Sequence, residues 1–157
     1  MTGEDATAVD GGSDEPTDAL VEVVRASGHE NVTAEHASTL EVTSDDWLTP
    51  AGDCILAVAA DRVPADFDDA FVVACQRHDA RIVATLEAGG RSVRVEGRGH
   101  PDLSFENERS HVLRTSDYVD DRTVMVGADA AAGDVNRALV SALADGADAT
   151  LRLSVEP

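Results

Sequence analysis

The chain has 157 residues, of which 43% are hydrophobic and 3% aromatic, and its formal net charge is −19. This length suits one domain or two closely joined halves, with a core built from small aliphatic side chains. Two cysteines exclude a disulfide-dense scaffold, and no apolar run approaches the ~18 residues that a membrane-spanning helix needs. With no signal peptide in the sequence, we expect a cytoplasmic protein with reduced thiols and no membrane partner.

The acidic residues are spread over the whole chain, and all twelve cationic side chains are arginines. At ordinary ionic strength such a surface repels itself, whereas at about 1 M salt the Debye length falls to ~3 Å and screens the repulsion. The composition therefore indicates a halophilic protein adapted to a salt-rich cytoplasm. The alternative is an acidic chain that meets a basic partner.

Residues 1–18 contain six acids, no base and two adjacent glycines. Such a segment has almost nothing to bury, so we predict a disordered acidic tail. Residues 19–157 then form a single domain.

Two stretches of this domain are nearly the same. The sequence GHENVTAEHASTLEVTSDDW (Gly28–Trp47) is followed 71 positions later by GHPDLSFENERSHVLRTSDY (Gly99–Tyr118). The correspondence continues at an offset of 68 after a three-residue deletion, and at 69 near the C-terminus. This pattern predicts a tandem duplication, with repeat one at residues 19–90 and repeat two at 91–157.

Each repeat contains the same predicted elements in the same order. Period-two patterns and apolar runs predict three strands in each, at Ala19–Ser27, Val32–Thr43 and Cys54–Ala60, and at Arg91–Arg98, Leu103–Arg114 and Thr123–Ala128. The first strand ends in a Gly-His turn, where we expect the glycine to take a positive φ.

A helix and a last strand complete each repeat. Asp66 and Asp134 stand where a helix N-cap acceptor belongs, an apolar stripe at helical spacing follows each, and Gly146 is a C-terminal cap. The last strands are predicted at Arg81–Glu87 and Thr150–Val155, with a tight turn at Ala88–Gly90 between the repeats.

The predicted fold class is α+β, a tandem duplication of a β-β-β-α-β unit. Four strands with one helix leave an apolar sheet face that the other repeat must cover. We expect one pseudo-two-fold, barrel-like domain, closed or half-open, with two flanking helices. Two face-to-face α+β layers are the alternative.

The motifs in repeat one resemble those of an archaeal family of domains of unknown function. Its members carry G-H-x-N, then H-x-T-T-L-E-x-T, then L-T-x-x-G-D-C-I, and this chain has GHENVTAEHASTLEVT followed by LTPAGDCILAV. The similarity spans Ala19 to Glu156, and Ser38 stands where the family has threonine. The resemblance implies an archaeal protein without an assigned reaction, so it transfers no catalytic residue.

Repeat one is richer than repeat two in reactive side chains, so we place a candidate ligand site there. The candidate residues are His29, Asn31, His36, Glu41, Asp53 and Cys54. His36 lies on the apolar face of its predicted strand, where burial favours the neutral imidazole that binds a metal or acts as a base. We expect it to face a cavity close to another member of this set, although a hydrogen-bonded core histidine is the simpler interpretation.

Three classes of function stay open. The first is a small-ligand- or metal-binding module, with His36, His29 and Cys54 as possible metal ligands, although no C-x-x-C or H-x-x-x-H spacing is present. The second is a small enzyme in which His36 and Cys54 act with a carboxylate. The third is an RNA- or protein-interaction module that uses the arginine-rich hairpin 91–122, although seven acids in that window favour ordinary ion pairing over nucleic acid. The cofactor and the oligomeric state are unknown from sequence.

Overall fold

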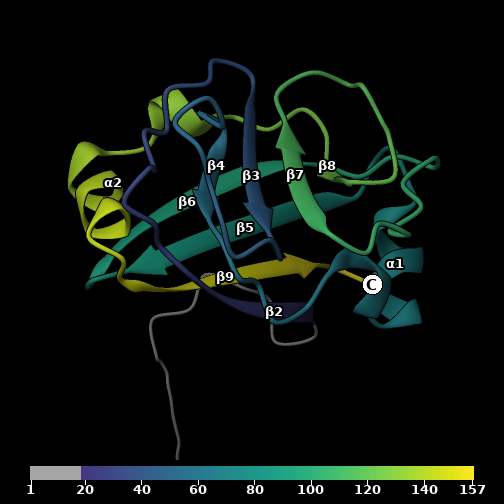
Figure 1. Ribbon diagram of the computed structural model, residues 1–157. Coiled ribbons are helices and arrows are strands. Elements are labelled where there is room, and N and C mark those ends of the chain that lie inside the picture. The colour runs from purple at the N-terminus through teal and green to yellow at the C-terminus, as the bar shows by residue number, and fades with distance from the viewer. Residues whose placement is uncertain (1–18) are drawn as a thin grey trace, which may run out of the picture.

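Two four-stranded sheets form the fold of residues 19–157, the part of the chain that this computed structural model describes (Figure 1). The larger sheet is antiparallel throughout. Its strands, in spatial order, are β2 (Leu20–Ser27), β9 (Asp148–Val155), β5 (Arg81–Ala88) and β6 (Arg91–Arg98). The tail predicted for residues 1–18 lies outside the described residues.

The smaller sheet lies across one face of the larger sheet (Figure 1). Its strands, in spatial order, are β4 (Ile55–Ala57), β3 (Thr39–Thr43), β7 (Ser110–Arg114) and β8 (Thr123–Met125). The central pair β3–β7 is antiparallel, and the two outer pairs are parallel. Aliphatic side chains from both sheets form one core, as the strand alternation predicts.

Two short helices lie at opposite ends of the sheets (Figure 1). They are α1 (Asp69–Cys75) and α2 (Arg137–Ala144), preceded by the 3₁₀ turns η1 (Pro64–Asp66) and η2 (Ala132–Asp134). The predicted caps Asp66 and Asp134 accept bonds from the backbone at the start of the 3₁₀ turns, and each α-helix begins three residues later. Among residues 19–157, neither helix has the length and apolar character needed to cross a bilayer.

The predicted fold class, α+β with two helices, is confirmed, but the prediction of a closed barrel is wrong. The described strands form two four-stranded sheets rather than one continuous barrel. Among the described residues, the facing edges of the two sheets meet at two isolated antiparallel bridges, Ser27–Val58 and Arg98–Val126, each just after a three-residue edge strand, β4 or β8. A single bridge at each edge does not provide the continuous ladder that a closed barrel has.

Both strand orders read the same when the elements of residues 19–90 are exchanged for those of 91–157. The larger sheet becomes β6-β5-β9-β2, and the smaller becomes β8-β7-β3-β4. Unusual backbone conformations follow the same exchange: positive φ angles occur at Ala34 and Phe105, 71 positions apart, and at Ala59 and Gly127, 68 positions apart.

The predicted strands Val32–Thr43 and Leu103–Arg114 are too long. Only their last five residues are strands, because Ala34 (φ 51°) and Phe105 (φ 53°) interrupt the extended conformation. Both side chains are buried, with exposures of 0% and 3%. Burial alternates over Val32–Glu35 and Leu103–Glu106 without a sheet ladder, and the alternation stops before β3 and β7.

The glycines of the two Gly-His turns were predicted to have positive φ, and this is wrong. Among the described residues the glycines with positive φ are 89, 90, 127 and 146. Gly28 and Gly99 are instead needed for space, because a Cβ at Gly28 would lie 2.0 Å from the carbonyl oxygen of Leu143, and one at Gly99 would lie 2.1 Å from that of Cys75. Each glycine therefore packs against the end of the helix that belongs to the other half of the chain.

His111 is a buried polar group in the core that sequence analysis did not select. It is fully buried, stacks on Phe67 with ring centroids 5.6 Å apart, and its Nδ1 lies 3.1 Å from the carbonyl oxygen of Val42. Nδ1 must therefore carry the proton, and Nε2 has no hydrogen-bond partner among the described residues. Burial lowers the pKa of His111 and favours the neutral ring.

This histidine should make folding stability depend on pH. Below about pH 6.5 the His111 ring is protonated in the unfolded chain but stays neutral in the folded chain, so stability is lost as the pH falls. Leu40 stands at the matching position of the first half, 71 residues earlier. The substitution His111→Leu should therefore remove the pH dependence and lower the free energy of unfolding by less than about 1.5 kcal/mol. Urea unfolding of both proteins at pH 5.5 and 7.5 measures it. An equal loss of stability in both would contradict the assignment.

Candidate functional site

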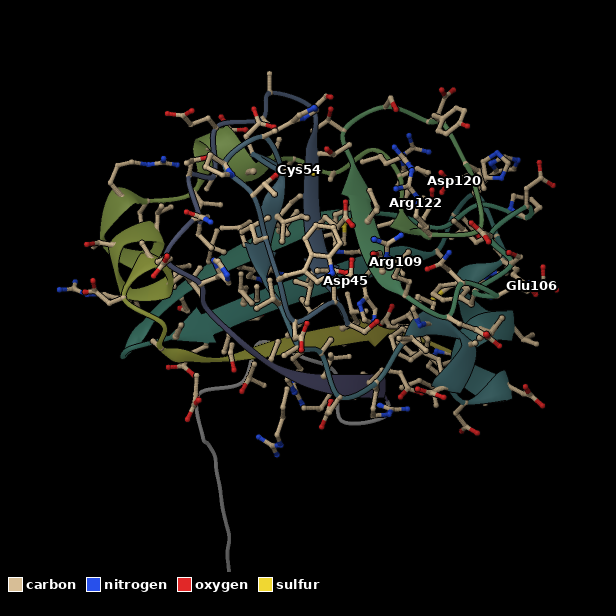
Figure 2. All side chains as sticks on the ribbon, in the orientation of Figure 1. Asp45, Cys54, Glu106, Arg109, Asp120 and Arg122 are labelled. Carbon is tan, nitrogen blue, oxygen red and sulfur yellow. The ribbon has the colours of Figure 1, made fainter. Side chains whose placement is uncertain are left out.

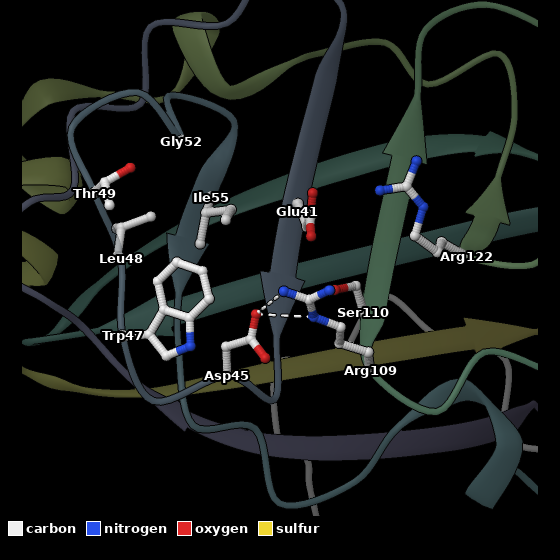
Figure 3. A pocket seen from close by; sticks show the side chains of 10 residues that line it. All are labelled: Glu41, Asp45, Trp47, Leu48, Thr49, Gly52, Ile55, Arg109, Ser110 and Arg122. Atoms are coloured by element: carbon white, nitrogen blue, oxygen red, sulfur yellow. Dashed lines mark hydrogen bonds and ion pairs between the residues drawn. The ribbon is translucent and has the colours of Figure 1, made fainter.

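The smaller sheet has an outer face that two loops border (Figure 3). On β3, Leu40 and Val42 point into the core and Glu41 points outward, opposite Val112 of β7. The segments that follow β3 and β7 border this face, and Val112 on it is only 2% exposed. A polar strand face is thereby turned into the floor of a partly enclosed site.

A cleft of about 190 Å³ lies on this face, between β3, β7 and the loop that follows β3 (Figure 3). Figure 3 shows the Glu41 side chain between an apolar wall and two guanidinium groups. The lining residues that matter chemically are Glu41, Asp45, Trp47, Ile55, Arg109 and Arg122.

Three ion pairs hold the charged side chains around the cleft, and Figure 2 labels four of the residues that form them, Asp45, Arg109, Asp120 and Arg122. Arg109 donates from Nε and Nη2 to Oδ2 of Asp45, at 2.9 and 2.6 Å. Asp120 accepts from Arg122 at 3.0 Å and from Arg114 at 2.9 Å. Burial alone would raise the pKa of Asp120, but the hydrogen bonds from Arg122 and the nearby Arg114 lower it to about 2.

Glu41 and Cys54 are the two sequence candidates whose side chains the structure brings together. The Cys54 thiol donates to Oε1 of Glu41 over 3.5 Å. Burial, and then the charge of Glu41, raise the pKa of Cys54 to about 11. The thiol therefore stays protonated at neutral pH, whereas a cysteine nucleophile needs the thiolate.

We expect Cys54 to react slowly with iodoacetamide. At pH 8 a thiol of pKa about 11 has roughly 100-fold less thiolate than one at the ordinary value of 9.0. Replacing Glu41→Gln removes the charge and should speed alkylation at least several-fold. Mass spectrometry separates Cys54 from the buried control Cys75, and unfolding in urea should equalise the two. A Cys54 that reacts at the rate of a free thiol would contradict this arrangement.

His36 is half-buried and holds a turn. Its Nδ1 accepts from the backbone amides of Ser38 and Thr39, both at 3.2 Å. Asn107, 71 positions later, stabilises the equivalent turn, because its Oδ1 accepts from the amides of Arg109 and Ser110 at 2.9 and 2.7 Å. The two residues differ in type but have one structural role, and His36 does not line the Glu41 cleft.

The other sequence candidates also stabilise loops. His29 Nδ1 accepts from the Asn31 amide at 3.0 Å, and His100 binds the Asp102 amide in the same way. The Asn31 side chain donates to the carbonyl of Leu48 at 2.8 Å. This bond anchors the loop that carries Trp47.

Asp53 joins the same region through its backbone. Its carbonyl oxygen accepts from the amides of Glu35 and His36, at 3.0 and 3.2 Å. Within residues 19–157, no group of three or more histidine, cysteine, aspartate or glutamate side chains is arranged to hold a metal ion.

Sequence analysis missed most of the cleft, namely Asp45, Trp47, Arg109 and Arg122. One signal was available, because Trp47 and Tyr118 occupy matching positions of the repeat. The chain has only five Trp, Tyr and Phe residues, namely one Trp, one Tyr and three Phe. Both are exposed, at 56% and 60%. A large aromatic side chain exposed twice at the same place is typical of a binding surface rather than a core.

The arginines of hairpin 91–122 are largely engaged in ion pairs. Four of the six, Arg94, Arg109, Arg114 and Arg122, bind carboxylates of the same chain. Their charge is therefore locally compensated, which weakens the case for a phosphate backbone as partner.

The chain matches the family described as "Domain of unknown function (DUF371)" over residues 24–156. It is also similar to an uncharacterized protein of Methanocaldococcus jannaschii, with 36% identity over 133 residues, which cover 85% of this chain and 98% of the relative. The family match spans every position that lines the cleft.

Proposed function

The chain belongs to this archaeal family of domains of unknown function, and we propose that it is a binding module for a small polar ligand, with its site at the Glu41 cleft. The observation that carries the proposal is the Glu41 carboxylate. It is half-buried, and among the described residues the weak donor Cys54 is its only hydrogen-bond partner. Removing a carboxylate from water is unfavourable unless strong hydrogen-bond donors replace the water. A bound ligand would supply them.

The size of the cleft limits the ligand. Its volume of about 190 Å³ is below the ~300 Å³ at which sites for drug-sized ligands begin. It suits one ring or one charged group with a few methylenes. Trp47 and Ile55 would contact the apolar part, and Glu41 the polar part.

The enzyme and nucleic-acid alternatives have less support. A protonated Cys54 is a poor nucleophile, and the His36 ring is engaged in a turn. Paired arginines leave little free positive charge for RNA.

Two further proposals concern the whole chain. The exchange of elements within both sheets supports tandem duplication of the unit predicted from sequence, as repeats 19–90 and 91–157 of one domain. The lysine-free, acidic composition supports a halophilic protein of the cytoplasm.

The ligand proposal can be tested because Trp47 is the only tryptophan and lines the cleft. Its fluorescence and the melting temperature would be followed in 2 M KCl with arginine amide, lysine amide, betaine, glutamate, adenosine and inorganic phosphate. We expect at least one saturable response that Glu41→Gln weakens tenfold or more. The matched control His36→Ala should retain it, since His36 lies outside the cleft. If no compound binds in a Glu41-dependent way, the proposal is wrong.

A further inference from the structure

The second half of the chain fills its own counterpart of the cleft with an arginine. Arg114 donates from Nε to Oγ1 of Thr123 at 2.8 Å and from Nη2 to Asp120 at 2.9 Å. Its Cζ lies 4.9 Å from the centroid of the Tyr118 ring, and the side chain is only 11% exposed. The guanidinium is thus enclosed between an aromatic face, a carboxylate and a hydroxyl.

The pairing of β3 with β7 shows which residue takes this place in the first half. Thr39 pairs with Arg114, and Thr43 pairs with Ser110, so exchanging the two strands puts Thr43 where Arg114 stands. Thr43 is too short to reach over the sheet. The space beside Trp47, the counterpart of Tyr118, is therefore left open, and the Glu41 cleft occupies it.

The acceptors around this space differ in position but not in kind. Gly52 and Ile55 stand where the second half has Asp120 and Thr123, so those two acceptors are lost. The carboxylate of Glu41 replaces them from the strand, where the second half has Val112. Asp45 has a second oxygen, because Arg109 binds its Oδ2.

The charges around the cleft balance, and the charge of the wider chain favours a cation. Arg109 is paired with Asp45, and Arg114 and Arg122 share Asp120, while Glu41 provides the third carboxylate. The loop of residues 44–53 carries three aspartates and no base, in a chain of net charge −19. Such a field lowers the local concentration of anions and raises that of cations.

We infer that the cleft binds the guanidinium group of a small molecule, stacked on Trp47 and paired with Glu41. The inference rests on the proposed function and gives it a ligand class. A guanidinium is planar and presents five N–H donors in one plane, so it can stack on the indole and bind a carboxylate with two parallel bonds. An ammonium group is compact and strongly hydrated, and it does neither as well.

The test compares arginine amide with lysine amide, two probes of equal charge, by Trp47 fluorescence and by calorimetry in 2 M KCl. We expect arginine amide to bind with a stoichiometry of one and at least fivefold more tightly than lysine amide. Glu41→Gln should weaken this binding at least tenfold, and inorganic phosphate should not compete.

A second variant tests the origin of the cleft. The Tyr118 side chain is already 60% exposed. Arg114→Thr should open the corresponding space beside it and raise the stoichiometry of arginine amide binding toward two. Lysine amide binding as tightly as arginine amide would overturn the inference. Binding of another panel compound that arginine amide does not displace would overturn the inference while the proposed function stands. Absence of binding by every compound would overturn both.

Discussion

Replacing Gly99→Ala should destabilise the protein by about 3 kcal/mol or more. An added Cβ would lie 2.1 Å from the Cys75 carbonyl oxygen and 2.7 Å from that of Arg77. These are backbone atoms at the end of α1, so the clash cannot be relieved by a change of rotamer. The Gly99 amide also donates to the carbonyl of Ala80 at 3.0 Å, and any movement of the strand would strain that bond.

Gly28→Ala should cost about as much, because its Cβ would lie 2.0 Å from the Leu143 oxygen at the end of α2. Urea unfolding at fixed KCl concentration measures both variants. The matched control is Gly90→Ala, a turn glycine with φ +75° and no atom within 4 Å of the added Cβ. It should cost only the ~1 kcal/mol of a left-handed backbone. Equal losses for Gly90 and Gly99 would show that close packing is not the reason for glycine.

Diluting salt should lower the melting temperature by roughly 10–20 °C between 3 M and 0.05 M KCl. The net charge of −19 repels itself over a Debye length that grows from under 3 Å to more than 10 Å across this range. A loss of about 5 kcal/mol corresponds to that shift for a chain of this size, at ~2–4 °C per kcal/mol.

Circular dichroism melts over a KCl series measure the effect. NaCl at equal ionic strength should give the same curve, since screening does not depend on the cation's identity. Sucrose at equal osmolality should not restore stability to the same extent. A melting temperature that stays flat across the series would remove the physical basis for calling the composition an adaptation to salt.

Local signals in the sequence located the hairpin β5–β6, which forms one side of the larger sheet. The strand predicted at Arg91–Arg98 has the observed bounds, and the Ala88–Gly90 turn has two glycines with positive φ. These features depend on residues close in sequence. The prediction of a closed barrel was wrong because the facing edges of the two sheets share only the isolated bridges Ser27–Val58 and Arg98–Val126 among the described residues, and no local pattern specifies how far two distant strands pair.

The site was predicted only in part for a similar reason. Glu41 and Cys54 were selected because the second half does not repeat these residue types at the matching positions, and the two side chains are in contact. Arg109 and Arg122 come from the other half and reach the cleft only through the β3–β7 pairing. His36 was selected because its residue type changes to asparagine, but imidazole and amide accept the same backbone bonds in this turn.

The pairing of β2 with β9 also constrains the order of folding. Leu20, near the start of the described chain, is the partner of Val155, near its end. The larger sheet therefore cannot acquire its first strand until the last strand has been synthesised, and closing so long a loop slows folding. Until then β2 is an apolar segment with an unpaired edge, the state in which nascent chains aggregate. Hairpin β5–β6, formed from neighbouring residues, can form first and nucleate the sheet. Strand β9 then pairs with β5 on one side and with β2 on the other.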